Sequence, residues 1–177
     1  DAMESRGLGD VYKRQASLPA ALQALVRAAE QIAAPRRLQP ALKTWLNRAV
    51  PLIDSDDPRH LAQVLNDLSE PINVVVLASG DPLWFGIGRI LTDRLGAERL
   101  RFHPAPTCLQ LAFARIGRPW QDARWLSLHG RDPEPLAQEL QRRPGALAVL
   151  TDPKRGGADA VRRCLRSSGL EASYCLL

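Results

Sequence analysis

The hydrophobic positions of this chain follow two alternating patterns. Short, nearly continuous apolar runs rich in valine and leucine are typical of strands that are covered on both faces. Segments with apolar residues at every third or fourth position are typical of helices. The pattern predicts strands at residues 72–78, 99–103, 123–129 and 146–152, with a candidate short strand at 49–53. It predicts helices at residues 17–34, 40–45, 58–68, 84–95, 109–117, 133–140 and 158–167. Strands that alternate with helices predict an α/β fold with parallel strands.

Three of the predicted strands end in similar loops, which read SGDP, PAPT and HGRDP. Each loop leads into a predicted helix, for which Asp81, Thr107 and Asp132 are the expected N-caps. Loops at the carboxyl ends of parallel strands line the ligand crevice of open α/β folds, and helix N-termini there favour anions and hydrogen-bond acceptors. The same residues are also common structural caps, and Gly80 is equally explained by a need for positive φ. The pattern alone leaves both interpretations open.

Composition excludes several classes of protein. No apolar run among the 177 residues approaches the ~20 residues of a membrane span. The three cysteines have no paired spacing, and the three histidines lie far apart, so we expect neither a disulfide framework nor a metal site. No Walker A motif or nucleophile elbow is present. The G-x-G at residues 86–88 is not a dinucleotide-binding fingerprint, because that motif must directly follow a strand and Gly86 falls inside a predicted helix. We expect a cytoplasmic protein.

Positive charge is concentrated in the second half of the chain. Residues 1–88 hold 9 basic and 10 acidic residues, whereas residues 89–177 hold 15 and 9. Of the 24 basic residues 21 are arginine, whose planar fork binds carboxylates and phosphates in pairs. A bias in codon usage explains this content as well as a polyanionic ligand does. The arginines are scattered, without a basic run or interleaved aromatic residues, so we do not expect nucleic-acid binding.

The ends of the chain differ from its middle. Residues 1–15 show no periodicity, and SRGLGDVYKRQ resembles a translated adapter sequence, so we exclude this tail from the fold. The segment GRPWQD separates one strand–helix pattern from the next. We therefore predict an N-terminal α/β domain at residues 16–117, a hinge at 118–122 and a partial C-terminal α/β domain at 123–177.

Three ordered motifs together resemble the tetrapyrrole methylase family. They are LASGDPLWFGIGR, PAPTCLQLAFARIGRPWQDAR and LSLHGRDP, and the last two are similar to the branch that methylates precorrin-6Y at carbons 5 and 15 in cobalamin biosynthesis. The resemblance implies two α/β domains with S-adenosylmethionine in the cleft between them. It also implies that the first strand of the family fold and the end of its second domain are missing here, so that we expect this fragment to be inactive alone.

The resemblance also implies positions for the binding residues. The residues expected near the cofactor are Gly80, Asp81, Pro82, Trp84, Thr107, Cys108 and Thr151, where Thr107-Cys108 replaces the usual Ser-Ser of the family. Trp84 is equally expected as a core residue. The residues expected near the carboxylates of the substrate are Arg115, Arg118, Arg124, His129 and Arg131, each of which is otherwise explained as a surface or backbone-bonded side chain.

The implied activity is methylation of precorrin-6Y at carbon 5. Transfer from a sulfonium needs little acid–base help, so we assign no catalytic residue. The alternatives are methylation of another tetrapyrrole carbon, a non-catalytic nucleoside-binding α/β domain, and a nucleotide-dependent oxidoreductase. We expect a tetrapyrrole as the partner, no membrane, and a homo-oligomer for the full-length protein.

Overall fold

The computed structural model describes residues 18–69, 72–130 and 132–176. The chain divides into two compact units between Thr107 and Cys108. The predicted tail at residues 1–15, the helix cap predicted at Ser17 and the predicted substrate residue Arg131 lie outside the described residues.

The first unit is built around a parallel sheet of three strands. β1 (Gln31–Ala34) lies between β2 (Leu52–Asp54) and β3 (Val74–Val76). In the register of the sheet, Ile32 pairs with Leu52 on one side and with Val75 on the other. The parallel α/β architecture predicted from the apolar runs is therefore confirmed.

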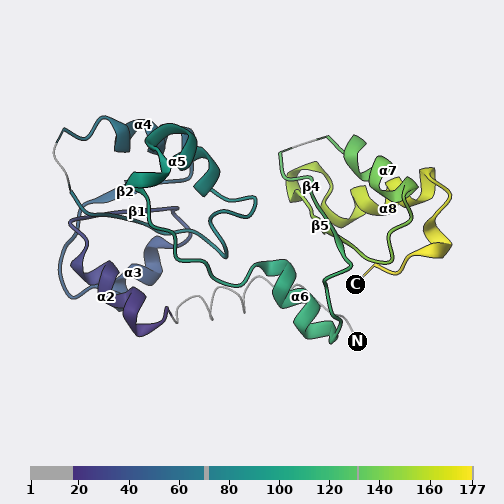
Figure 1. Ribbon diagram of the computed structural model, residues 1–177, viewed down its shortest axis with the longest axis horizontal. Coiled ribbons are helices and arrows are strands. Elements are labelled where there is room, and N and C mark those ends of the chain that lie inside the picture. Colours follow the sequence, from purple (N-terminus) through teal and green to yellow (C-terminus); the bar gives the residue numbers. More distant parts are fainter. Residues whose placement is uncertain (1–17, 70–71, 131, 177) are drawn as a thin grey trace. The chain divides into compact units, whose positions relative to one another are not determined.

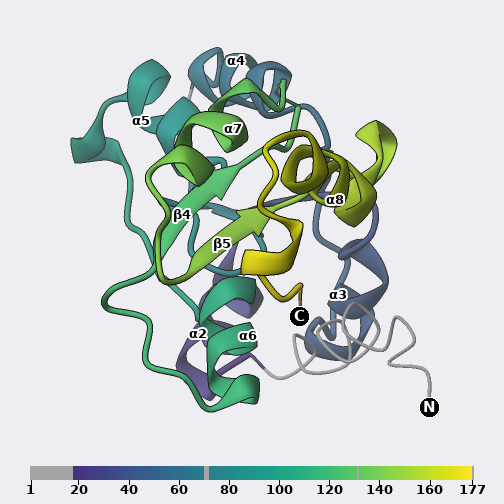
Figure 2. The same cartoon turned by 90° about the vertical axis from the view of Figure 1, so that its right-hand side faces the viewer.

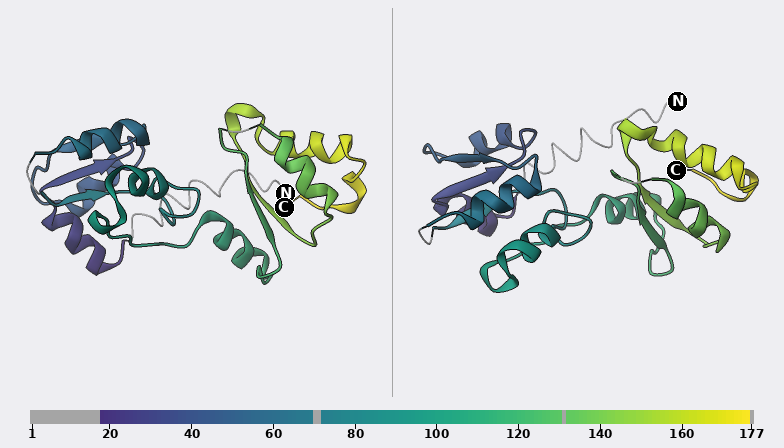
Figure 3. Two further views of the ribbon diagram at one scale, coloured as in Figure 1. Left: turned by 45° about the horizontal axis from the view of Figure 1, so that its top comes forward. Right: turned by 90° about the horizontal axis from the view of Figure 1, so that it is seen from above.

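Helices cover both faces of this sheet (Figures 1 and 3). α2 (Ala20–Ala28) and α3 (Gln39–Trp45) pack on the face that carries Ile32 and Ala34. α4 (Pro58–Asn66) and α5 (Gly88–Leu95) pack on the face that carries Ala33. Successive strand residues point to opposite faces, and Ile32, Ala33 and Ala34 are completely buried. The central strand therefore contributes to two cores, one on each face.

The second unit has a sheet of two parallel strands, β4 (Arg124–Ser127) and β5 (Leu147–Leu150), which Figure 2 shows side by side. α7 (Glu134–Gln141) and α8 (Gly157–Ser167) form a core with Leu126, Leu147 and Val149. α6 (Cys108–Ile116) also belongs to this unit. The Phe113 ring of α6 lies 5.9 Å from the Trp125 ring of β4. Short 3₁₀ helices span Ala97–Arg99, Pro153–Arg155 and Glu171–Ser173.

The largest error of the sequence prediction is at residues 17–34, for which one helix was expected. α2 ends at Ala28, and Gln31–Ala34 form the central strand β1. Alanine fits both periodicities, so the local pattern does not separate the end of the helix from the strand. Pairing with β2 and β3 decides the conformation, because burial between two helical layers outweighs local propensity.

Two further segments differ from their predictions. Residues 100–106, which include most of the predicted strand 99–103, carry no sheet pairing in the structure. A strand needs a neighbouring edge, and no strand of the described part of the chain pairs with this segment. The helix predicted at 84–95 begins only at Gly88, so the loop after β3 is longer than expected.

The division into units falls at the start of α6, before the predicted hinge at residues 118–122. The helix predicted as the last one of the first domain therefore packs with the second unit, through Phe113 and Trp125. The function of residues 118–122 as a hinge stays a prediction.

Candidate functional site

In the first unit, the carboxyl ends of the three parallel strands define the candidate site. β1 runs into Pro35, β2 runs into Ser55, and β3 runs into the loop that contains Gly80. Because the strands are parallel, these three loops leave the sheet at the same edge, which is where open α/β sheets bind ligands.

The structure brings two of the predicted ligand loops together. Gly80 has φ +68°, and its carbonyl oxygen accepts a hydrogen bond from the Ala105 N–H at 3.3 Å. A Cβ atom on Gly80 would lie 3.4 Å from the Cα of Thr107, which is ordinary contact. Glycine is therefore required here for its positive φ rather than for space. Thr107 is buried, whereas Cys108 is exposed and begins the second unit.

Asp81 shapes the loop rather than capping α5, so the predicted capping function is wrong. Its Oδ1 atom accepts the Leu83 N–H at 2.9 Å, and its carbonyl oxygen accepts the Trp84 N–H at 3.2 Å. These bonds form a local turn of the type that aspartate favours. Among the described residues, nothing donates a hydrogen bond to the other carboxylate oxygen, Oδ2. That oxygen is available to a ligand.

Two glycines allow a close backbone approach in the second half of this loop. The carbonyl oxygen of Pro82 accepts the Gly88 N–H at 2.8 Å. A Cβ atom on Gly86 would lie 2.5 Å from that oxygen, and a Cβ atom on Gly88 would lie 2.6 Å from it. Any side chain at either position forces the backbone to move. The two glycines therefore allow the chain to fold back on Pro82, which makes the loop compact.

One cluster of charged residues at the same sheet edge is not among the residues predicted from the sequence. Arg36 follows β1, and its Nε donates to Oδ2 of Asp54 at 2.6 Å and lies 3.7 Å from Oδ2 of Asp56. The Asp56 N–H and the Arg36 guanidinium hold the pKa of Asp54 below its usual range. The hydrogen bond to Asp54 and the charges of Asp54 and Asp56 raise the pKa of Arg36. These contacts connect the loop after β1 to the end of β2 and the loop that follows it. The predicted helix at 17–34 concealed them, because it placed Arg36 after a helix instead of after the central strand.

In the second unit, Asp152 connects the loops that follow β4 and β5. Its Oδ2 accepts the Gly130 N–H at 3.0 Å, and its Oδ1 accepts the Lys154 N–H at 2.9 Å. The Gly130 bond is the main reason that the pKa of Asp152 is lowered, against the opposing effect of burial. His129 is exposed and adds a favourable charge interaction, and Thr151 precedes Asp152 at the end of β5. His129 and Thr151 were predicted from the sequence but Asp152 was not, although an Asp-Pro pair after an apolar run is the signal that identified Asp81.

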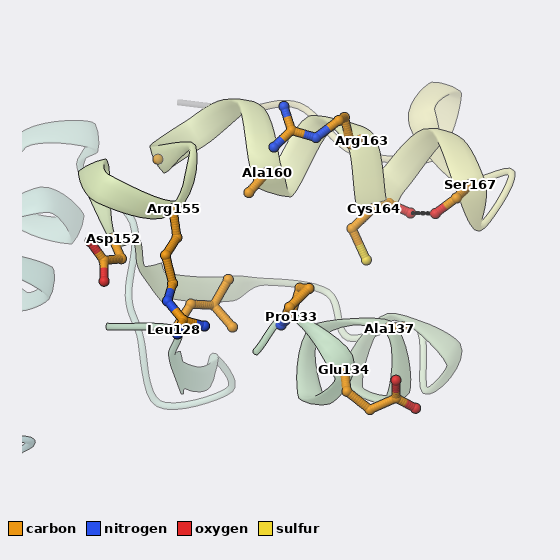
Figure 4. Close-up of a pocket in the computed structure, with 11 residues that line it drawn as sticks. Leu128, Pro133, Glu134, Ala137, Asp152, Arg155, Ala160, Arg163, Cys164 and Ser167 are labelled. Carbon is orange, nitrogen blue, oxygen red and sulfur yellow. Dashed lines mark hydrogen bonds between the residues drawn. The ribbon is translucent and has the colours of Figure 1, made fainter. Parts of the chain in front are cut away.

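A hollow of about 550 Å³ lies between α7 and α8. Figure 4 shows the Cys164 side chain pointing into it and the Arg155 side chain reaching toward Leu128. Arg155 also pairs with Asp132 at 2.9 Å, so Asp132 does not cap α7 as predicted. None of the described site residues predicted from the sequence lines the hollow.

The predicted substrate arginines that the structure describes lie in the second unit. Arg118 pairs with Asp122 at 2.9 Å, and Arg115 is exposed in the last turn of α6. Arg124 pairs with Glu139 at 3.2 Å and begins β4, so it lies at the end of the strand opposite to His129. The pair raises the pKa of Arg124 and lowers that of Glu139, chiefly through the hydrogen bond between them. Their assignment to a substrate stays a prediction.

In the described ranges, no three potential metal ligands cluster. None of the helices formed by those residues has both the length and the apolar composition needed to cross a bilayer.

Comparison with known proteins agrees with this architecture. The family model described as Tetrapyrrole (Corrin/Porphyrin) Methylases matches residues 15–175. The crystal structure of the methyltransferase CobJ superimposes with a TM-score of 0.65 and 22% identity, over 85% of this chain and 70% of that one. This structural likeness concerns the fold alone.

Two curated relatives are similar in sequence. A precorrin-6Y C(5,15)-methyltransferase [decarboxylating] of Sinorhizobium sp. is 39% identical over 100 residues, which cover 56% of this chain and 24% of the relative. A cobalt-precorrin-7 C(5)-methyltransferase of Salmonella typhimurium is 36% identical over 91 residues, which cover 50% of this chain and 43% of the relative. The aligned regions thus span less than half the length of either relative.

Proposed function

Because the chain belongs to the tetrapyrrole (corrin/porphyrin) methylase family, we propose that it is the methylase part of an S-adenosylmethionine-dependent enzyme that methylates precorrin-6Y at carbon 5. The observation that carries this proposal is the similarity to two relatives whose names both specify C5. The second relative acts on a cobalt-containing precorrin-7, which makes that compound the second candidate substrate.

The loop after β3 fits the cofactor that this function requires. S-Adenosylmethionine supplies a methyl group on a positively charged sulfur, and its ribose hydroxyls and amino group are hydrogen-bond donors. The free Oδ2 of Asp81 is an anionic acceptor for such a donor. Gly80 and Thr107, in contact beside it, supply backbone at close range without a bulky side chain.

Methyl transfer from a sulfonium releases a neutral thioether, so the chain needs no strong general acid. What it must supply is alignment of the donor with the nucleophilic carbon and exclusion of water, and orientation of this kind accounts for about 7–11 kcal/mol of a barrier. A loop that the hydrogen bond between the Gly88 N–H and the Pro82 carbonyl folds back on itself suits this task, because less of it has to be ordered when the ligands bind. Consistent with that task, we assign no residue as a catalytic base.

The proposal is tested by titrating the folded chain with S-adenosylhomocysteine and, separately, with NAD in a calorimeter. We expect saturable binding of S-adenosylhomocysteine alone. The variant Asp81→Asn keeps an oxygen acceptor for the Leu83 turn but removes the charge, and we expect it to bind about 10-fold more weakly or worse. Asp93→Asn, on the exposed surface of α5, removes the same charge away from the loop and should leave the affinity unchanged.

Each alternative predicts a different result. Binding of NAD in place of S-adenosylhomocysteine would favour the oxidoreductase. If S-adenosylhomocysteine binds but the chain, joined to the flanking segments of the Salmonella relative, transfers no methyl group to any precorrin, the non-catalytic nucleoside-binding domain is favoured. Transfer to a carbon other than C5 would correct the position of methylation.

A further inference from the structure

Two large apolar side chains project from the loop after β3 and are not explained by the core. Leu83 is 56% exposed and Phe85 is 49% exposed. The Trp84 ring between them in sequence is half-buried and meets the Phe85 ring edge to face at 4.7 Å. Single exposed apolar residues are ordinary, but two on one compact loop at the ligand edge of a sheet point to a contact surface.

The backbone holds Phe85 in an unfavourable conformation. Its φ is +49°, which is rare for any residue with a Cβ atom and more so for a bulky one. The loop on either side is fixed, because Gly86 and Gly88 fold against the carbonyl group of Pro82. Such strain persists where the surrounding structure enforces it, and it is concentrated at functional sites. Here it keeps a large apolar ring on the surface, where it adds little to the core.

A positive charge stands next to these side chains in the sequence. Arg89 is the second residue of α5, is exposed, and has no ion-pair partner among the described residues. Leu83 lies beside the start of this helix, because a Cβ atom on Gly88 would lie 3.0 Å from its Cδ2 atom. Apolar side chains and an unpaired guanidinium therefore occur on neighbouring segments. This combination matches a ligand that has a flat apolar ring and carboxylates at its rim.

We propose that Leu83 and Phe85 contact one face of the tetrapyrrole ring and that Arg89 pairs with a carboxylate at its rim. The inference rests on the proposed function and extends it to residues that bind the substrate. A second copy of the chain is a poorer fit, because a stable dimer interface needs about 800 Å² from each partner, which two side chains do not supply.

The test uses uroporphyrin, a fluorescent tetrapyrrole with eight carboxylates, titrated into the chain while S-adenosylhomocysteine affinity is measured separately. We expect Leu83→Ala and Phe85→Ala each to weaken uroporphyrin binding about 5- to 10-fold. Arg89→Gln should weaken it similarly and reduce its dependence on salt. None of the three should change the affinity for S-adenosylhomocysteine more than twofold.

Matched control variants distinguish the loss of a direct contact with uroporphyrin from a general loss of stability. Leu52→Ala removes a 49% exposed leucine at the first position of β2, at the opposite edge of the sheet, and Arg99→Gln removes an exposed arginine after α5. Both should retain parental affinity. Phe85→Tyr keeps the aromatic face and should bind nearly as well as the parent chain, which shows that the loop still folds.

The outcomes distinguish this inference from the proposed function. If the parent chain fails to bind S-adenosylhomocysteine, the proposed function fails. If it binds S-adenosylhomocysteine but not uroporphyrin, or if the variants at residues 83, 85 and 89 bind uroporphyrin like the controls, the inference is wrong. A dimer in sedimentation that Phe85→Ala dissociates would make a second copy the occupant and would also overturn it.

Discussion

At the scale of single residues, the loop after β3 is determined by glycines that act for different physical reasons. Gly80 supplies a positive φ, since a Cβ atom there would find ordinary contact distances. Gly86 and Gly88 supply space, since a Cβ atom on either would overlap the carbonyl group of Pro82. The sequence shows three glycines in nine residues, but only the contacts separate these two requirements.

Substitution of Gly86 tests the space requirement. We expect Gly86→Ala to lower the free energy of unfolding by about 1–3 kcal/mol, because the new methyl group forces the loop backbone apart. It should also weaken S-adenosylhomocysteine binding. Urea unfolding and calorimetry measure both effects. Gly145→Ala is the control, because a Cβ atom there meets nothing within 4 Å, and it should change stability by less than about 0.5 kcal/mol. Equal effects of the two substitutions would contradict the prediction.

At the scale of elements, α4 shows how the sequence sets a helix boundary. Asp57 is its N-cap, and its side chain accepts the N–H groups of Arg59 at 2.9 Å and His60 at 3.2 Å. Pro58 occupies the first helical position, where its missing N–H costs nothing. The predicted helix at 58–68 is confirmed at its start for these reasons, and it ends at Asn66.

Removal of this cap should be measurable. We expect Asp57→Ala to destabilise the first unit by about 1 kcal/mol, because two N–H groups at the start of α4 lose their acceptor. Asp67→Ala removes the same charge at the other end of α4, where a carboxylate is unfavourable for the helix dipole, and should be neutral or slightly stabilising. Urea denaturation followed by circular dichroism compares the two. A loss in Asp67→Ala as large as that in Asp57→Ala would show that charge, not capping, is responsible.

The loops after β4 and β5 make the stability of the second unit depend on pH. The pKa of Asp152 is lowered mainly by the Gly130 N–H, so its ionised form is favoured in the folded state. Its contribution to stability is therefore complete above the unfolded value, about 3.9, and is lost as the pH falls through the folded pKa. We expect Asp152→Asn to be less stable than the parent at pH 7 and to lose less stability between about pH 5 and pH 3.

The measurement is the urea midpoint of the second unit at each pH. Asp159→Asn removes a carboxylate that pairs with Arg162 on the surface of α8, and it should keep the pH dependence of the parent chain. A parental slope in Asp152→Asn would show that other carboxylates cause the acid response.

At the scale of the whole molecule, the chain has separate hydrophobic cores in its two units. Leu61 is completely buried in the first unit, in a cluster with Ala33 and Leu91. Leu136 is completely buried in the second, in a cluster with Leu165. No residue belongs to a core of both units in the described part of the chain.

Core truncations should therefore act locally. We expect Leu61→Ala and Leu136→Ala each to cost about 2–5 kcal/mol in the unit that contains it, and the double variant to show both losses, each in its own unit. Hydrogen exchange resolves the two units: Leu61→Ala should reduce protection in β1 and β3, and Leu136→Ala in β4 and β5. Leu52→Ala, on the exposed side of β2, is the control. Reduced protection of both sheets in either single variant would contradict independent cores.

The sequence by itself determined the α/β class, the strands at β3, β4 and β5, and the family. Strongly apolar runs such as Val74–Val76 have one stable environment, a strand covered on both faces, so their pattern is unambiguous. The loop at Gly80-Asp81-Pro82 was also predicted at the end of β3, because glycine and proline interrupt a strand, and Gly80 has the positive φ that glycine tolerates.

Only the tertiary structure decided which residues form the central strand and which loops meet at the edge of the first sheet that carries the candidate site. Gln31–Ala34 has no local preference strong enough to distinguish strand from helix, and pairing on both sides settles it. With β1 in place, Arg36, Asp54 and the Gly80 loop reach one edge, although they are far apart in sequence. Strand pairing is a long-range interaction, and the energy that selects it comes from burial against both helical layers, which no local window of sequence contains.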